Sequence, residues 1–308
     1  MNGSEEAVQA TNEDANECKR CAVELRYWSD EFLQYFVRRC DRKAPEINRG
    51  YYARYKAIST LVDQFIKITG KKGQIINLGS GFDTTFWRLK SNNIKVKRFV
   101  DLDFKVVTSR KSFIIYHNKL LKDLVGGTIR VTSTDLHSED YHLVGADMSK
   151  LDEVKAKLLD CDLDLSAPTL FIAECVLVYV DCEASHGLLS WLAQKFNQAC
   201  FVNYEQINME DSFGTIMMKN LRERGCLLAG VPACKNLETQ RNRFIISNWD
   251  GSNAWDMMEV YSSIPLGERQ KVEKLEFLDE HELLAQLFQH YCIAVGYKGE
   301  LLRDVGFG

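Results

Sequence analysis

Between residues 74 and 206 the chain repeats one unit, a short apolar segment followed by a segment with helical spacing of its apolar residues. The apolar segments are 74–78, 96–103, 141–147, 168–176 and 199–205. Because they are largely apolar throughout, rather than at alternate positions, we expect strands buried on both faces of a mainly parallel sheet. This alternation predicts an α/β fold, a doubly wound sheet with helices on both faces.

The segments on either side of this core are expected to be mainly helical. Before it, the apolar spacing predicts helices in 19–42, which Pro45 ends, and in 51–68. After Gln206 the alternation of predicted strands and helices stops. The sequence there predicts three helices within an insertion at 208–270, a helix at 278–290 and a last strand at 292–297. Together with this region, the five core segments predict a seven-stranded sheet. The three inserted helices are predicted at residues 211–222, 235–246 and 254–262.

The two ends of the chain are expected to lie outside the folded domain. Residues 1–17 hold five acids and no Lys or Arg, so we expect a disordered acidic tail. The domain is expected to run over 18–299, with N-terminal helices in 18–70. Residues 300–308 are expected to form a C-terminal tail.

Charge and composition narrow the classes of function. Without the five N-terminal acids the body carries 38 acidic and 39 basic residues, so it lacks the basic excess of a nucleic-acid binder. The most apolar stretch, 169–180, contains Glu174 and is too short to span a bilayer. We therefore expect neither a nucleic-acid nor a membrane partner. Ten scattered cysteines and no secretory signal predict reduced thiols and a cytoplasmic location.

A glycine turn follows the first strand, in Leu78-Gly79-Ser80-Gly81. Glycine lets the backbone turn sharply and lets a ligand approach it closely. In a doubly wound sheet this turn lies at the carboxyl edge, where ligands bind. Thr84 stands where the dinucleotide pattern requires a third glycine, which counts against a pyrophosphate-containing cofactor. The alternative is an ordinary tight turn between a strand and a helix.

Acidic residues end the next three strands. Asp101 and Asp103 are both placed to accept hydrogen bonds from ribose hydroxyls. Asp147 can accept from an adenine amino group while Met148 packs on the ring. Glu174 lies near the end of the strand expected to be the most buried, where a carboxylate needs a partner such as the ammonium of an amino-acid-like cofactor. Helix capping is the alternative for the aspartates, and an internal ion pair or hydrogen bond for Glu174.

Arg54 lies on the predicted helix before the first strand, in the segment Arg49-Gly-Tyr-Tyr-Ala-Arg54. This helix could fold over the edge of the sheet, and a guanidinium suits bidentate recognition of a carboxylate. A surface salt bridge is the alternative.

Five segments resemble the leucine carboxyl methyltransferase family. They are RKAPEINRGYYAR (42–54), QIINLGSGFDTTFWRLK (74–90), FIAECVLVY (171–179), VNYEQINMEDSFG (202–214) and LEFLDEHELLAQLFQHYC (275–292). The resemblance implies a class I methyltransferase fold with S-adenosylmethionine as cofactor. It further implies that the chain esterifies the C-terminal leucine of the protein phosphatase 2A catalytic subunit, a reaction that regulates holoenzyme assembly. The phosphatase would then be engaged through its C-terminal tail and its active-site face.

The resemblance also implies roles for individual residues toward the cofactor. Arg54 would hold the methionine carboxylate with Lys19 nearby, and Glu174 would face the methionine amino group. The glycine turn would line the methionine portion, and between the two competing aspartates Asp103 is favoured for the ribose. The resulting cofactor-binding set is Lys19, Arg54, Gly79, Gly81, Asp103, Asp147, Met148 and Glu174.

The expected reaction needs neither a general base nor a metal. A sulfonium methyl is already activated, and an α-carboxyl with a pKa of about 3.5 is ionised at neutral pH. Catalysis then reduces to alignment, for which Tyr179 and Tyr204 at strand ends are the candidates. His137 and His142 flank the start of the third strand, which is the opposite edge. The insertion at 208–270 and the N-terminal helices are expected to wall a pocket for the leucine side chain.

Two other functions remain open from the sequence. One is a related carboxyl methyltransferase acting on a modified tRNA base or a small acid. That relative carries a long additional C-terminal repeat domain, whereas this sequence stops at Gly308. The other is an inactive phosphatase-binding module, against which the intact glycine turn and Glu174 argue. We expect the chain to be a monomer.

Overall fold

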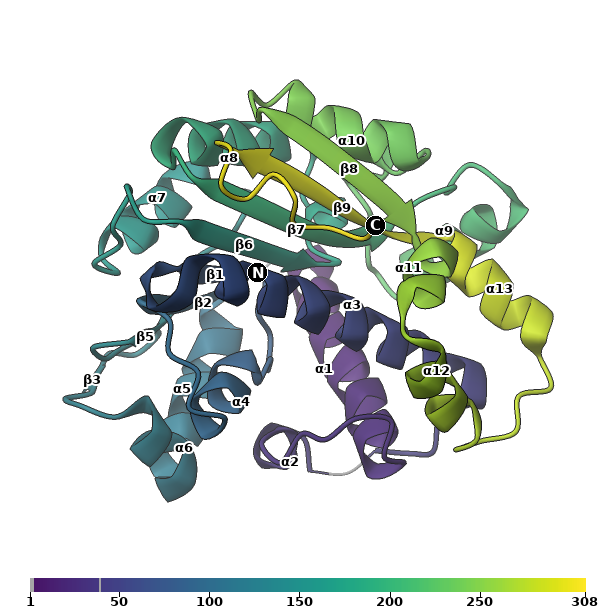
Figure 1. Ribbon diagram of the computed structural model, residues 1–308, viewed down its shortest axis with the longest axis horizontal. Helices are drawn as coiled ribbons and strands as arrows, with labels where there is room; N and C mark the ends of the chain where they lie inside the picture. The colour runs from purple at the N-terminus through teal and green to yellow at the C-terminus, as the bar shows by residue number, and fades with distance from the viewer. Residues whose placement is uncertain (1–2, 39) are drawn as a thin grey trace.

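The computed structural model describes residues 3–38 and 40–308, and a single sheet forms its centre (Figure 1). The strand order is β3-β4-β5-β2-β1-β6-β7-β9-β8. The five strands from β5 to β7 in this order are parallel, whereas the pairs β3–β4, β4–β5, β7–β9 and β8–β9 are antiparallel. The strands are β1 (Gln74–Leu78), β2 (Arg98–Asp103), β3 (Arg130–Val131), β4 (Leu136–His137), β5 (Tyr141–Gly145), β6 (Thr169–Glu174), β7 (Ala199–Gln206), β8 (Gly251–Asp256) and β9 (Tyr291–Lys298).

Helices surround this sheet, and the described residues also form three short 3-10 turns. The α-helices are α1 (Gly3–Glu24), α2 (Leu33–Phe36), α3 (Pro45–Thr69), α4 (Thr85–Ser91), α5 (Lys105–His117), α6 (Lys119–Val125), α7 (Leu151–Leu159), α8 (Cys182–Lys195), α9 (Ser212–Glu223), α10 (Leu237–Ile245), α11 (Met257–Ser263), α12 (Leu266–Glu273) and α13 (His281–Gln289). The 3-10 turns are η1 (Gly70–Lys72), η2 (Leu177–Tyr179) and η3 (Val231–Ala233).

Two apolar cores lie on the two faces of the sheet. Successive strand residues alternate between them: Ile75 belongs to the core with side chains of α3, α4 and α5, whereas Ile76 belongs to the core with side chains of α7 and α8. This alternation follows from the two-residue period of a strand, and it explains why the parallel strands are apolar at almost every position. The mainly parallel α/β fold expected from the sequence is confirmed.

The expected count of seven strands is wrong, because the described residues form nine. The two-residue strands β3 and β4 come from a segment to which the sequence assigned no element. Strand β8 occupies 251–256, part of which was predicted as a helix. The helix α11 begins only at Met257, where the Asp256 side chain accepts a hydrogen bond from the Glu259 N–H in a capping box. Pairing with β9 keeps the residues before this cap extended.

The expected acidic tail is wrong for residues 3–17, which belong to the helix α1. This helix packs beside α3 (Figure 1), and two of its acidic side chains have partners far along the chain. Glu13 pairs with Arg110, and Asp14 pairs with Arg224. Residues 1 and 2 of the expected tail lie outside the described residues.

The predicted helix over 19–42 is also wrong after its first turns. The helix α1 ends at Glu24, and the chain then turns into the four-residue helix α2. Proline 45 begins α3 rather than ending the preceding segment, because the first helical position needs no N–H donor.

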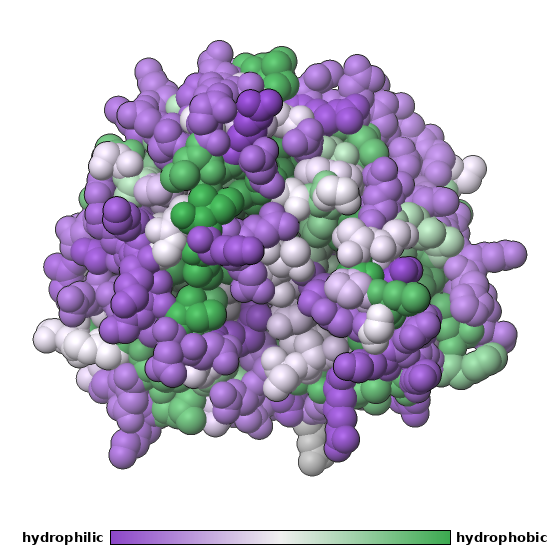
Figure 2. All heavy atoms as spheres, in the orientation of Figure 1, coloured by the Kyte–Doolittle hydropathy of each residue, from purple (hydrophilic) through white to green (hydrophobic). Residues whose placement is uncertain are grey.

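The segment 300–308 is part of the packed domain rather than a tail. Leu302 and Val305 are buried in the core, and the Gly306 N–H donates to the Gln64 Oε1 at 2.9 Å. Hydrophilic side chains cover most of the face drawn in Figure 2, and its apolar side chains gather mainly in a strip left of centre. Among the described residues, no helix has the length and apolarity needed to cross a membrane.

Candidate active site

A cavity of about 720 Å³ opens at the carboxyl edge of the parallel strands, between the sheet and the helices α1, α3 and α9. It contains every residue that the sequence predicted for cofactor binding or catalysis. Those residues come from the helices α1 and α3, and from the strands β1, β2, β5, β6 and β7 or the segments that follow these strands. They are Lys19, Arg54, Gly79, Gly81, Asp103, Asp147, Met148, Glu174, Tyr179 and Tyr204.

The glycine turn requires glycine at two positions. Gly79 and Gly81 have φ angles of +64° and +50°, in the left-handed region that side chains disfavour. A Cβ on Gly79 would lie 2.4 Å from the Val176 side chain, and one on Gly81 would lie 2.1 Å from the Asn12 Oδ1. The Ser80 hydroxyl in the same turn is buried without a hydrogen-bond partner among the described residues. The turn therefore offers a ligand close backbone approach and an unused polar group.

The two competing aspartates have different environments. Asp101 does not line the cavity; its Oδ2 accepts from the Lys111 Nζ at 2.8 Å and from the Tyr141 hydroxyl at 2.7 Å. Asp103 lines the cavity and accepts from the Gly81 N–H at 2.6 Å. Burial raises the pKa of Asp103 to about 6, against the lowering effect of its backbone hydrogen bonds. The Asp101 carboxylate is thus bound to buried side chains, and Asp103 is the aspartate that a ligand in the cavity can reach.

Asp147 and Met148 follow the carboxyl end of β5. The Asp147 Oδ1 accepts from the Ser149 N–H at 2.9 Å and from its hydroxyl at 2.7 Å. Burial opposes ionisation of Asp147, but the hydrogen bonds from Ser149 and Lys150 outweigh it and hold the pKa below its usual value. The Met148 methyl lies 3.4 Å from the Cβ position of Gly79, so this segment adjoins the glycine turn.

Three charged side chains from α1, α3 and β6 meet inside the cavity. The Glu174 Oε2 lies 2.6 Å from the Arg54 Nε and 3.4 Å from the Lys19 Nζ. Burial would raise the pKa of Glu174, but Lys19 and Arg54 outweigh it and lower this pKa to about 2. The internal ion pair considered for Glu174 is therefore present. The cluster holds two cations and one anion, so its net charge is +1. Its anion can bind an ammonium and its cations can bind a carboxylate, so it suits a group that bears both.

Tyrosine rings form the wall beside this charged cluster. Tyr204 stacks on Tyr291 with ring centroids 5.3 Å apart, and the Arg54 guanidinium lies 4.7 Å from the Tyr204 ring centroid. Burial raises the pKa of Tyr179 and of Tyr204, so both phenols keep their protons and can donate to a carboxylate.

Sequence reasoning missed several residues of the cavity. Tyr291 begins β9 and reaches the site because β9 runs antiparallel to β7, with Tyr291 opposite Gln206. Gln206 is buried, and its Oε1 has no hydrogen-bond partner among the described residues. The only signal for Tyr291 was its place at the end of the family-like segment 275–292, since its pairing register could not be derived from the sequence.

Three comparisons relate the chain to known proteins. A family model described as leucine carboxyl methyltransferase matches residues 7–193. The leucine carboxyl methyltransferase 1 of Bos taurus is 47% identical over 309 residues, covering 96% of this chain and 91% of that protein. The tRNA wybutosine-synthesizing protein 4 of Homo sapiens is 35% identical over 306 residues, but the match spans only 45% of that longer protein.

A solved structure supports the fold independently of sequence. A putative methyltransferase from Thermobifida fusca YX superposes with a TM-score of 0.51 at 13% identity, covering 87% of this chain and 93% of that one. At this identity the likeness concerns the fold alone. The family model and the 47% identity to the Bos taurus protein over almost the whole chain show more than the fold. The chain belongs to the leucine carboxyl methyltransferase family and is an S-adenosylmethionine-dependent methyltransferase.

Proposed function

We propose that this chain methylates the C-terminal leucine carboxylate of the protein phosphatase 2A catalytic subunit, and so regulates assembly of the phosphatase holoenzyme. The observation that carries the proposal is the meeting, in one cavity, of the glycine turn with the Lys19–Arg54–Glu174 cluster. Relatives named leucine carboxyl methyltransferase match 90% or more of their own length to this chain. A cytoplasmic location belongs to the proposal, and the ten free cysteines support it because disulfides are rare there.

The cavity residues fit S-adenosylmethionine from one end to the other. The charged cluster suits the amino-acid end, with Glu174 toward the ammonium and Arg54 and Lys19 toward the carboxylate. Asp103 suits the ribose hydroxyls because its carboxylate lines the cavity while Asp101 does not. Asp147 and Met148 suit the adenine. When bound, the cofactor supplies a methyl group activated by the positive charge of its sulfonium.

The remaining task of the protein is to align an oxygen of the leucine carboxylate. That carboxylate is ionised at neutral pH, so no group has to take a proton from it. Tyr179 and Tyr204 would donate hydrogen bonds to it and fix its direction, and the raised pKa values of their buried phenols support this role because both stay protonated. Alignment of this kind can account for a large part of a rate enhancement.

The outer wall of the cavity is placed to receive the substrate tail. Met217 and Leu221 of α9 face it from the 208–270 insertion, and Val8 of α1 completes an apolar lining. These side chains suit the isobutyl group of leucine, because burying an apolar side chain is favourable by about 1.5–3 kcal/mol. The phosphatase active-site face would then meet the exposed surface of the same helices.

The choice of acceptor is tested by methyl transfer from labelled cofactor in two parallel reactions. One contains the phosphatase catalytic subunit, and the other contains the tRNA that serves the wybutosine-type relative. We expect label in the phosphatase and none in the tRNA. Label in tRNA alone would replace this proposal with the tRNA-modifying function.

A further inference from the structure

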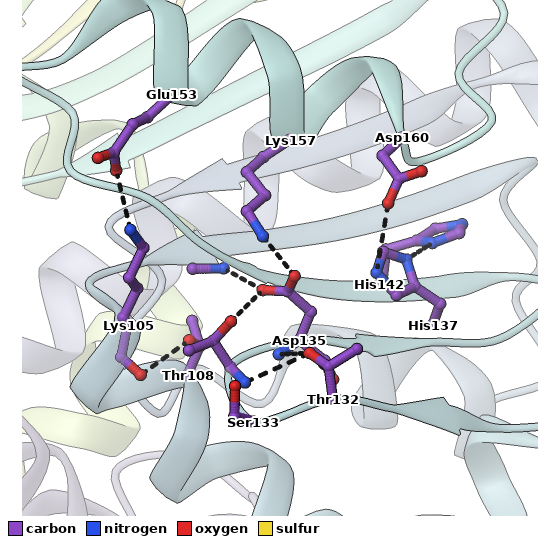
Figure 3. Close-up of polar contacts among 12 residues, drawn as sticks. Lys105, Thr108, Thr132, Ser133, Asp135, His137, His142, Glu153, Lys157 and Asp160 are labelled. Carbon is purple, nitrogen blue, oxygen red and sulfur yellow. Dashed lines mark hydrogen bonds and ion pairs between the residues drawn. The ribbon is translucent and has the colours of Figure 1, made fainter.

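A second cluster of ligand-type side chains lies at the opposite edge of the sheet, and none of its residues lines the cavity. His137 ends β4 and His142 lies in β5, as Figure 3 shows, and Cys161 follows α7. One ring nitrogen of each histidine and the Cys161 Sγ lie within 4.8 Å of one another, and the three residues are 6%, 2% and 0% exposed. Within the described ranges 3–38 and 40–308, it is the one such group of three His, Cys or acidic side chains.

The two imidazoles face each other through the same kind of nitrogen. The His137 Nδ1 lies 2.9 Å from the His142 Nδ1, a contact that requires a proton on one nitrogen and a lone pair on the other. The Asp160 Oδ2 lies 3.8 Å from the His137 Nε2 and favours a proton there, which leaves the His137 Nδ1 lone pair facing His142. His142 then carries its proton on Nδ1. Its Nε2 is buried with no partner among the described residues.

We propose that His137, His142 and Cys161 form a binding site for a zinc ion. Two imidazole nitrogens and one thiolate are donors that zinc prefers, and a water can complete the tetrahedron. Asp160 lies on the outer nitrogen of His137, where metal-binding histidines commonly have an orienting carboxylate. Zinc–nitrogen bonds of about 2.0–2.1 Å need the two Nδ1 atoms about 3.3 Å apart, so the pair has to open by only a few tenths of an ångström.

Zinc binding at this site has a definite proton balance. The metal forms bonds to the two Nδ1 atoms and to the Cys161 sulfur. The His142 proton moves from Nδ1 to Nε2, and the Cys161 thiol loses its proton to solvent. Each zinc ion that binds therefore releases one proton. Burial raises the pKa of the Cys161 thiol, but coordination to a cation deprotonates a thiol directly.

The charges around the cluster are mixed. Arg98, Arg130 and Lys157 oppose a cation near the histidines, whereas Asp135, Asp160 and Asp162 favour one. Lys157 is engaged with Asp135, as Figure 3 shows.

Burial and neighbouring positive charges disfavour the charged form of both rings. Burial, with a smaller contribution from His137 and Arg98, lowers the pKa of His142 to about 4. Burial, with Arg130, also holds the pKa of His137 below its usual value. Neutral imidazole is the form that binds zinc.

The position of the site indicates a structural role for the ion. It joins the short hairpin of β4 and β5 to the end of α7, while Asp147 and Met148 lie at the other end of the β5–α7 unit. Zinc would hold this unit together without touching the methyl-transfer cavity. Bound metal should therefore raise the thermal stability and leave the transfer chemistry unchanged.

The test uses the full chain, stripped of metal and titrated with Co²⁺ and then with Zn²⁺. We expect a thiolate-to-cobalt charge-transfer band that saturates at one equivalent and disappears as Zn²⁺ displaces Co²⁺. Cys161→Ser should abolish the band. Asp160→Ala changes a side chain that is 64% exposed, so this variant should fold, and its zinc affinity should fall about 10–100-fold. Zn²⁺ should raise the melting temperature of the unmodified chain.

A matched control separates this site from other thiols. The double variant Cys40→Ser/Cys182→Ser removes two more accessible thiols and should keep the full cobalt band. The proposal is overturned if the folded, unmodified chain gives no thiolate–cobalt band. It is overturned equally if the band survives Cys161→Ser, or if the Asp160→Ala variant binds zinc as tightly as the unmodified chain.

Discussion

The Arg54 guanidinium and the Glu174 carboxylate form a buried ion pair inside the cavity, with the Arg54 Nε 2.6 Å from the Glu174 Oε2. The Arg54 Nη2 also donates to the Glu174 backbone carbonyl at 3.2 Å. Arg54 belongs to α3 and Glu174 ends β6, so the pair fixes the N-terminal helices against the carboxyl edge of the sheet. A ligand that binds here meets charges whose positions are already set, which reduces the cost of ordering them.

Replacing Glu174 by Gln should weaken binding of the demethylated cofactor about 10–100-fold. The substitution removes the anion and leaves Arg54 and Lys19 facing each other and the cofactor ammonium, and a charged hydrogen bond contributes about 1.5–3 kcal/mol. Calorimetric titration measures the change. Asp140→Asn, which breaks the ion pair with Lys90 outside the cavity, is the control and should bind normally. Unchanged affinity in a folded Glu174→Gln chain would remove Glu174 from the cofactor site.

Gly81→Ala should weaken cofactor binding at least tenfold and leave the chain folded. The added Cβ would meet Asn12, and a left-handed backbone costs a non-glycine residue about 1–2 kcal/mol. Gly267→Ala, where the Cβ meets nothing within 4 Å, is the control. The double variant Asn12→Ala/Gly81→Ala should recover part of the affinity, because only the contact is relieved. Normal binding by Gly81→Ala would contradict a close backbone approach.

Substitution of the two aspartates of β2 should affect different properties, stability for Asp101 and cofactor binding for Asp103. Asp101→Asn leaves the buried Lys111 without its anion, so the free energy of unfolding should fall by about 3–5 kcal/mol. Asp103→Asn should weaken cofactor binding and leave the stability nearly unchanged. Denaturant unfolding measures the first effect, and titration with the demethylated cofactor measures the second. The reverse pattern would assign the ribose to Asp101.

The pH dependence of binding and of the rate should differ. Asp103 protonates near pH 6, so cofactor affinity should fall as the pH drops below about 6, and Asp103→Asn should not show this fall. Because burial raises this pKa above its unfolded value, the same group contributes more stability at low pH and loses it as the pH rises through about 6.

The rate at saturating cofactor should stay flat between about pH 6.5 and 8.5, because the nucleophile is ionised throughout and no histidine among the described residues lines the cavity. A rate that rises tenfold per pH unit through neutrality would require a general base.

The site could be predicted further than the scaffold around it. Carboxyl ends of parallel strands share one edge, so the glycine turn, Asp103, Asp147 and Glu174 could be placed together from the sequence alone. The sequence could not show that Asp101 pairs with Lys111 and does not line the cavity. That pairing depends on how α5 packs against β2, which is a property of the tertiary structure. Tyr291 depended in the same way on an antiparallel register.

The ends of the chain were predicted poorly for a related reason. Local composition made residues 1–17 resemble a solvated tail, but Glu13 and Asp14 find Arg110 and Arg224 about one hundred and two hundred residues away in sequence. Ion pairs with residues so distant in sequence cannot be predicted from the composition of residues 1–17. Leu302 and Val305 at the other end are likewise buried by elements that precede them by many residues.

The most direct test of the proposed function compares two phosphatase catalytic subunits, one complete and one lacking its C-terminal leucine, incubated with the enzyme and labelled cofactor. The account predicts about one methyl group per complete subunit, released as methanol by mild base because it is held as an ester, and none on the shortened subunit. Equal labelling of the two proteins, or label that resists base, would contradict transfer to the leucine carboxylate.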